Sequence, residues 1–509
     1  MTDLRILVTL LLFSFASAFQ WYPLGNWIEE EGDNTLAGHC VANSVDGKTI
    51  VVSAPYYSPE GSEGMRHGRV VAYKFDELRD AWDRLGDDIV GEPGDTLGWS
   101  LGMAEDGESV IVGAPGNNKN GIRSGMAKVY VLDRATGLPK WIQKGQTMYG
   151  SQAFDEFGYS VDIKDGGQVI AVGSPGEDKS DGSLDESGAV RIYKWTSASR
   201  WSVISDVVEG TEAHSRFGES ISLSQVGSLA IGAPYAGNSA GHVSMIRYNS
   251  TDATWHALDT IQRTTEIRVG DLFGYAVSVS FDGSTVAIGA PRHKGNDNNL
   301  LKRSGAVTVH KYDAASKSWL QVGNEIVGDS GGVESGTSVH MSDSGEEVAI
   351  GSPYSGGASS PESGHISVFI NDPILGWRQM DIDIYGKTSY NHLGKSVALS
   401  GNGRQVMGGA PTEGYATVYQ LAETAPPTSS PTAPPKVNTS VKKRNAFGEF
   451  VRVVFILALC GIIAFAVYKV VKVSRRRRAG GSFEPTTPTD LEMTPHGVPE
   501  EAGEERDVI

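Results

Sequence analysis

The feature that most constrains this chain is a pattern that recurs seven times. A short apolar run ends each time in a small residue followed by proline, and successive prolines lie 57 to 62 residues apart. A fixed period of this length indicates a repeat architecture in which neighbouring units bury each other's apolar faces. The seven small-proline pairs are Ala54-Pro55, Ala114-Pro115, Ser174-Pro175, Ala233-Pro234, Ala290-Pro291, Ser352-Pro353 and Ala410-Pro411.

Three further marks accompany each repeat in constant order. A glycine lies upstream of the proline, as in Phe157-Gly158, a second glycine lies downstream, as at Gly188, and a tryptophan such as Trp201 opens the last segment. Together they divide a repeat into four short strands, in the third repeat 159–163, 169–173, 189–195 and 201–208. Asp-Gly or Asn-Gly pairs between the first two strands predict two-residue hairpin turns in which both residues have positive φ.

The seventh repeat stops after its third strand, at residues 416–421. The segment Trp21–Ile28 matches Trp319–Ile326, which opens the fourth strand of the fifth repeat. We therefore expect the N-terminal segment to complete the last blade and to close the ring, which removes exposed sheet edges. The predicted fold is all-β: a seven-bladed β-propeller over residues 19–421, with about 58 to 60 residues in each blade.

The order Phe-Gly followed by Gly-Ala-Pro resembles the FG-GAP repeat of integrin α-subunit propellers. The resemblance implies an extracellular propeller that binds a ligand or partner, often in cell adhesion. The integrin-like loops that hold calcium are longer, whereas here each is a tight turn with one Asp, and one carboxylate cannot supply six to eight oxygen ligands. We expect no metal and no cofactor.

The ends of the chain carry targeting signals. Residues 1–18 read as a signal peptide with a small-x-small cleavage site at Ala16-Ser17-Ala18. Residues 422–449 form a Pro/Thr/Ser-rich stalk, residues 450–472 an apolar segment long enough for one transmembrane helix, and residues 473–509 a basic, then acidic tail. These signals predict a single-pass type I membrane protein of the secretory pathway, at the cell surface or an internal membrane. The tail could recruit a cytoplasmic adaptor.

Charge and cysteine content narrow the function further. The formal net charge is −17, and the propeller segment is acidic, which argues against nucleic acid as a partner. Only Cys40 and Cys460 occur, and Cys460 lies in the apolar segment, so the external part has no internal disulfide. We interpret Cys40 as a buried small apolar residue.

Candidate ligand-binding residues lie in the long loops between the second and third strands, because long loops on a rigid scaffold usually carry binding. The unknown ligand is an extracellular protein or a glycan. The candidates are Asn117, Asn118, Asn120, Glu177, Asp178, Asp181, Asp185, Glu186, His293, Asn296 and Asp297. Glycosylation is predicted at the sequons of Asn249 and Asn438.

No catalytic residue is assigned. The sequence lacks a nucleophile elbow and a phosphate-binding loop, and its histidines show no metal-ligand spacing. We therefore expect a non-catalytic recognition protein. Two alternatives stay open: a membrane-tethered hydrolase acting on glycans, with a catalytic set assembled across blades, and a structural link between wall or matrix and membrane.

Overall fold

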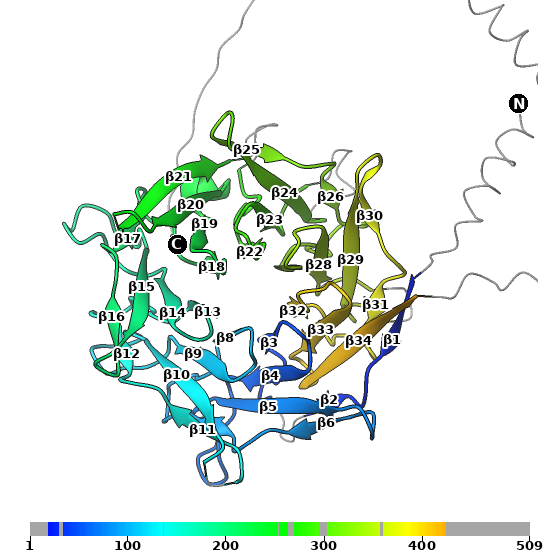
Figure 1. Cartoon of the computed structure of the whole chain (residues 1–509), viewed down its shortest axis with the longest axis horizontal. Coiled ribbons are helices and arrows are strands. Elements are labelled where there is room, and N and C mark those ends of the chain that lie inside the picture. The colour runs from blue at the N-terminus through cyan, green and yellow to red at the C-terminus, as the bar shows by residue number, and fades with distance from the viewer. Residues whose placement is uncertain are drawn as a thin grey trace, which may run out of the picture. The chain divides into compact units, whose positions relative to one another are not determined.

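The computed structural model describes residues 19–423, except 30–33, 136, 253, 263–268, 295–302 and 357–359. All of these residues belong to one compact unit. Figure 1 shows seven antiparallel sheets arranged as blades around a central axis. The seven-bladed propeller predicted from the repeats is thus confirmed.

In blades 1 to 6 the first four strands run in chain order from the axis outward, and where a fifth short strand is present it pairs with the third strand beside the fourth. Blade 1 contains β3 (Val41–Asn43), β4 (Thr49–Ala54), β5 (Arg69–Asp76), β6 (Ala81–Arg84) and β7 (Ile89–Val90). Blade 2 contains β8 (Ser100–Met103), β9 (Ser109–Ala114), β10 (Met126–Asp133), β11 (Lys140–Gln143) and β12 (Met148–Tyr149). Blade 3 contains β13 (Ser160–Lys164), β14 (Val169–Ser174), β15 (Ala189–Thr196), β16 (Arg200–Val203) and β17 (Val208–Glu209).

The remaining blades follow the same order. Blade 4 contains β18 (Ser220–Leu223), β19 (Ser228–Ala233), a short helical turn α2 (Ala236–Ser239), β20 (His242–Asn249) and β21 (Thr254–Ile261). Blade 5 contains β22 (Ala276–Val279), β23 (Thr285–Ala290), β24 (Ala306–Asp313), β25 (Ser318–Gln321) and β26 (Ile326–Val327). Blade 6 contains β27 (Ser338–Met341), β28 (Glu347–Ser352), β29 (His365–Asp372), β30 (Gly376–Gln379) and β31 (Ile384–Tyr385).

Blade 7 joins the two ends of the described chain. Its inner strands are β32 (Ser396–Leu399), β33 (Gln405–Ala410) and β34 (Tyr415–Glu423), and its outer strands are β1 (Phe19–Pro23) and β2 (Ile28–Glu29). β1 pairs antiparallel with β34, so that Trp21 lies opposite Leu421. In Figure 1 the blue β1 lies beside the orange β34. The predicted closure of the ring by the N-terminal segment is therefore confirmed.

The hydrophobic core is divided among the contacts between blades. Seven clusters of buried side chains occur in the described residues, and each combines residues from two neighbouring blades. The second strand of each blade, such as β9, is almost fully buried because sheets cover both of its faces. Stability is therefore spread around the ring, and each blade depends on its two neighbours.

The glycines of the repeat allow close approach of adjacent blades. Gly125 bridges to Phe157 of the next blade, and a Cβ at Gly125 would lie 2.2 Å from the Phe157 carbonyl oxygen. A Cβ on Gly113, just before Ala114-Pro115, would lie 2.0 Å from the Gly158 carbonyl oxygen. Both positions therefore require glycine, which explains why the Phe-Gly and Gly-Ala-Pro marks recur together.

Two local predictions were wrong. The predicted fourth strand 201–208 is divided into β16 and β17, and the equivalent strand is divided in every blade except blade 4. In four blades a glycine with positive φ lies at the break and against the tryptophan of the next blade, where a side chain has no room; these are Gly25, Gly86, Gly145 and Gly323.

The turn between the first two strands also differs from the prediction. In Asp46-Gly47 only the glycine has positive φ, whereas both residues of Asp165-Gly166 do. The Asp46 carboxylate instead accepts hydrogen bonds from the Lys48 N–H at 2.9 Å and the Ser44 hydroxyl at 2.6 Å. The aspartate therefore fixes the turn through its side chain rather than through a left-handed backbone.

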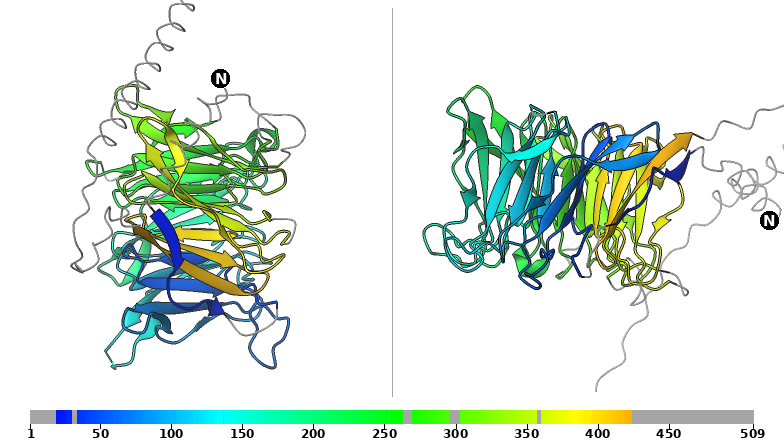
Figure 2. Two further views of the ribbon diagram at one scale, coloured as in Figure 1. Left: turned by 90° about the vertical axis from the view of Figure 1, so that its right-hand side faces the viewer. Right: turned by 90° about the horizontal axis from the view of Figure 1, so that it is seen from below.

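The two faces of the disc, which Figure 2 shows from the side, are different. One face carries the loops between the second and third strands and the connections between blades, and we call it the long-loop face. Loops and connections on this face are hydrogen-bonded to each other; for example, the Gly94 N–H of a connection donates to the Met65 carbonyl of a loop. The opposite turn face carries the Asp-Gly turns. β34 ends on the turn face, since the Leu421 N–H bonds to the Arg404 carbonyl.

The predicted signal peptide, stalk, transmembrane segment 450–472 and tail lie outside the described residues. Within the described part of the chain, no helix has the length and apolar character needed to cross a membrane.

Candidate functional site

A channel of about 670 Å³ runs along the propeller axis and is lined by the innermost strands of all seven blades. Its volume falls in the range of small-molecule sites. Each inner strand begins after the glycine of the Phe-Gly mark, so equivalent positions form rings around the channel. Three of these rings contain the side chains that determine its chemistry.

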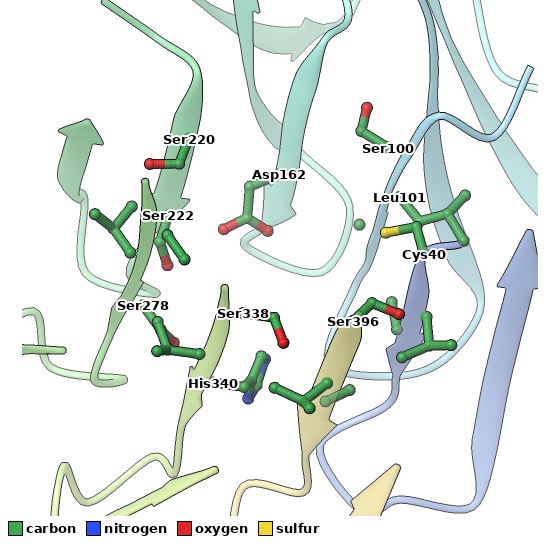
Figure 3. A pocket seen from close by; sticks show the side chains of 18 of the residues that line it. Cys40, Ser100, Leu101, Asp162, Ser220, Ser222, Ser278, Ser338, His340 and Ser396 are labelled. Atoms are coloured by element: carbon green, nitrogen blue, oxygen red, sulfur yellow. The ribbon is translucent and has the colours of Figure 1, made fainter. Parts of the chain in front are cut away.

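The first, here the mouth ring, consists of the residue directly after that glycine and lies at the long-loop end. Its members are His39, Trp99, Tyr159, Glu219, Tyr275, Thr337 and Lys395. The serine ring lies one residue further along: Cys40, Ser100, Ser160, Ser220, Ala276, Ser338 and Ser396. The middle ring lies two residues beyond that: Ala42, Gly102, Asp162, Ser222, Ser278, His340 and Ala398. Figure 3 shows members of the serine and middle rings around the opening.

The serine ring joins neighbouring blades. The Ser220 hydroxyl donates to the Gly274 carbonyl of the next blade at 2.8 Å, and four other serines of the ring make the equivalent bond. Cys40 and Ala276 replace serine in blades 1 and 5. Burial raises the pKa of the Cys40 thiol to about 11, so the thiol stays protonated at neutral pH. Cys40 packs against the core between blades 1 and 2 but also lines the channel, so it is half-buried rather than buried as the sequence predicted.

Side chains of the middle ring accept hydrogen bonds from backbone N–H groups that the innermost strands leave unpaired. Asp162 accepts the Leu223 N–H of the next blade at 2.7 Å, and His340 Nδ1 accepts the Leu399 N–H at 3.2 Å. Ser222 and Ser278 accept equivalent bonds, since an inner strand has no further strand to pair with. These side chains therefore hold the ring together at its axis.

A charged cluster lies toward the turn face. Lys164 Nζ is 3.5 Å from Asp162 Oδ1. Burial alone would lower the pKa of Lys164, but the charges of Asp162, Glu105 and Asp343 raise it overall. Burial raises the pKa of Asp343 despite the nearby Lys164. The three carboxylates thus act on one ammonium. Among the described residues, no group of three His, Cys, Asp or Glu side chains is arranged to hold a metal ion.

The mouth ring combines aromatic rings with a neutralised carboxylate. The rings of His39 and Trp99 are 4.7 Å apart and those of Trp99 and Tyr159 5.8 Å apart, which forms a continuous aromatic arc over three blades. Glu219 accepts a bond from Arg216 Nε at 2.7 Å. Burial raises the pKa values of Glu219 and Tyr159. The charge of this carboxylate is thus already matched by a guanidinium.

Lys395 completes the mouth ring beside His39. Burial lowers the pKa of Lys395, although the charges of Glu334 and Glu219 oppose the shift. Burial and the Lys395 charge lower the pKa of His39 to about 4, so this imidazole is neutral at pH 7. The mouth therefore presents one ammonium beside neutral aromatic side chains.

The predicted loop residues lie on the long-loop face, where they stabilise their own loops. Asn117 donates to Asp95 at 2.7 Å, and Asn120 donates to the Gly150 carbonyl at 2.7 Å. Asn118 is exposed and accepts the Arg123 N–H at 2.8 Å. Of these three side chains, Asn118 and Asn120 remain on the surface.

The acidic loop of blade 3 has both internal and exposed members. Glu177 is buried and forms a two-bond ion pair with Arg191, at 2.5 and 2.6 Å. Its carboxylate is thus engaged within the blade. The other four acids of the loop are exposed: Asp178, Asp181, Asp185 and Glu186. The carboxylates of Asp178 and Asp181 accept hydrogen bonds within the loop, and that of Glu186 lies near His214.

His293 in blade 5 differs most from its expected position. Its side chain is only 1% exposed and lies 2.8 Å from Asp271. The loop histidine is therefore part of the interior rather than of the surface. Asn296 and Asp297 lie outside the described residues.

Of the two predicted glycosylation positions, the structure describes only Asn249. Asn249 is exposed at the end of β20, on the turn face, and its amide contacts Asp252 at 3.1 Å. Asn438 lies outside the described residues.

The mouth ring is a set of channel residues that was not predicted from the sequence. Its signal was present, because aligning the repeats on the Phe-Gly mark places seven residues at one position, and six of them are aromatic or charged on a scaffold of small and apolar neighbours.

Comparison with protein-family models and with curated protein sequences gave no match to this chain.

Proposed function

We propose that this protein is a single-pass type I membrane protein whose propeller binds an extracellular ligand or partner at the long-loop face, without catalysis of its own. The observation that carries the proposal is the position of the two ends of the ring. β1 begins and β34 ends together on the turn face, so a stalk leaving β34 leaves the long-loop face and the channel mouth accessible.

The resemblance to FG-GAP propellers of integrin α-subunits supports a role in cell-surface recognition. The glycines that carry the resemblance are required for contact between blades, so the motif itself accounts for the fold. The recognition role rests on the rigid ring, which presents exposed loop residues and a channel of ligand size on one face. The partner is an extracellular protein or a glycan, and the acidic tail would bind a cytoplasmic adaptor.

A screen of residues 19–423 against glycan and matrix-protein panels tests the proposal, with product release monitored in parallel. Binding without turnover is expected, whereas turnover of a glycan would favour the hydrolase alternative. Once a ligand is found, residues 179–185 should be replaced by a Gly-Ser turn, which leaves the Glu177–Arg191 pair intact. Loss of binding supports the long-loop face. Binding that survives this change but fails after a surface change beside Asp106-Gly107 would place the site on the turn face.

A further inference from the structure

The channel mouth contains more hydrogen-bond donors than acceptors. Among the described residues, no acceptor is bonded to the Lys395 ammonium, the Trp99 indole N–H, the Tyr275 hydroxyl or the His39 ring, although all four side chains line the channel. The carboxylate of the ring, Glu219, is already bonded to Arg216. Donors held without acceptors in a partly desolvated cavity favour an incoming oxyanion.

The charges around Lys395 support the same conclusion. The two carboxylates whose charges reach Lys395 are Glu219 and Glu334. Arg216 pairs with Glu219, and Arg303 pairs with Glu334. The ammonium is therefore the one member of this group without an ion-pair partner among the described residues. A cation in a partly buried site is stabilised by a hydrogen-bonded anion.

The aromatic arc indicates what carries that anion. The arc begins at His39, which follows Lys395 in the mouth ring, and it continues through Trp99 to Tyr159. The rings of this arc are tilted to one another, by 46° between His39 and Trp99 and by 53° between Trp99 and Tyr159. A six-membered sugar ring can therefore pack its C–H face on one of these rings and contact the edge of the next, while the Tyr275 hydroxyl can bond hydroxyl groups. A two-carbon acidic side chain of a peptide would contact only a small part of this arc. The channel volume of about 670 Å³ admits a ring-bearing ligand.

We propose that the channel mouth binds the carboxylate of an acidic sugar, a uronate unit, with Lys395 and Trp99 donating to the carboxylate and the pyranose ring packed on the aromatic arc. This inference rests on the proposed recognition function and names the ligand chemistry of one site within it.

Isothermal titration of the full-length chain with uronate oligosaccharides tests the proposal, with neutral oligosaccharides of the same ring skeleton as the comparison. The uronate should bind at least about tenfold more tightly, because a charge-assisted hydrogen bond contributes that factor or more. Lys395→Met should remove that preference, and Trp99→Phe, which keeps an aromatic ring but loses the N–H, should weaken uronate binding. Lys119→Met, an exposed lysine on the same face, is the control and should bind as the parent does.

Folding of the variant is checked by its melting temperature, which Lys395→Met should not lower because the ammonium has no ion pair to lose. Equal binding of charged and neutral sugars, unchanged uronate affinity of Lys395→Met, or no binding at about 10 mM sugar would overturn the proposal. A glutamate-rich peptide that binds where uronate does not would overturn it as well, since the ligand would then be a protein. Partner binding through the loops with no uronate preference would leave the recognition function standing and remove only this site.

Discussion

Closure of the ring by the N-terminal strand predicts that alanine substitutions at two adjacent residues of β1 differ greatly in their effect on the unfolding free energy. Trp21 is 8% exposed and packs in the cluster between blades 6 and 7, whereas Tyr22 is 44% exposed on the other side of the same strand. Replacement of a buried tryptophan by alanine costs about 3 to 5 kcal/mol of unfolding free energy. Replacement of the exposed tyrosine should change it by no more than about 0.5 kcal/mol.

These free energies convert into melting temperatures. A domain of this size unfolds with an entropy of about 0.85 kcal/mol/K, taking ~2.1 cal/mol/K for each residue. Trp21→Ala should therefore lower the melting temperature of the 19–423 fragment by about 4 to 6 °C, and Tyr22→Ala should leave it nearly unchanged. A fragment that starts at Asp33 loses all of β1 and β2, including buried Ile28, and should melt lower still.

Differential scanning calorimetry measures all three variants beside the parent. Equal shifts for Trp21→Ala and Tyr22→Ala would refute the packing argument. A fragment starting at Asp33 that melts like the parent would refute the closure model itself.

Three further predictions concern the channel and the turns. Ser220→Ala removes a bond between blades and should lower the unfolding free energy by about 1 kcal/mol in urea titrations, whereas Ala276→Ser, at the same ring position, should not; the reverse order would contradict the role of the serine ring. Burial lowers the pKa values of His310 and His340 to about 4, so the unfolded chain binds more protons between pH 6.5 and 4. Stability should therefore fall on acidification through this window by up to about 1.4 kcal/mol per pH unit for each histidine, and a His310→Phe variant that keeps the parent's slope would contradict this. Excess chelator should leave the melting temperature unchanged, because each tight turn offers too few oxygen ligands for calcium; a drop of about 10 °C reversed by calcium would show that a metal stabilises the fold.

The fold could be predicted because its constraints are local and repeated. Gly113 and Gly125 have no space for a side chain, and the tryptophans pack in the outer rim, so the same residues recur in each blade. The match of Trp21–Ile28 to an outer strand gave the closure for the same reason. The division of the outer strand was missed because the sequence does not mark it in the same way in every blade: Gly145 lies at the break in blade 2, whereas the break between β16 and β17 in blade 3 contains no glycine.

Aligned repeats could have identified which residues share a ring of the channel, but not their contacts, because these join residues that are far apart in the sequence. Ser220 bonds to Gly274, and Asp162 bonds to Leu223, only after the ring has formed. For the loops, the sequence predicted ligand contacts that the structure does not leave free. Glu177, for example, was a candidate ligand-binding residue, but its carboxylate is paired with Arg191 of the same blade.

The pairing of the first and last strands has a mechanical consequence. The backbone of Phe19 lies opposite that of Glu423, so the two ends of the described chain meet at one point of the disc. Under the proposed anchoring, tension between a bound ligand and the membrane enters the propeller at the end of β34. That strand is hydrogen-bonded on both sides, to β33 and to β1, so two ladders share the load. The segment that closes the ring thus also reinforces it at the point where force would arrive.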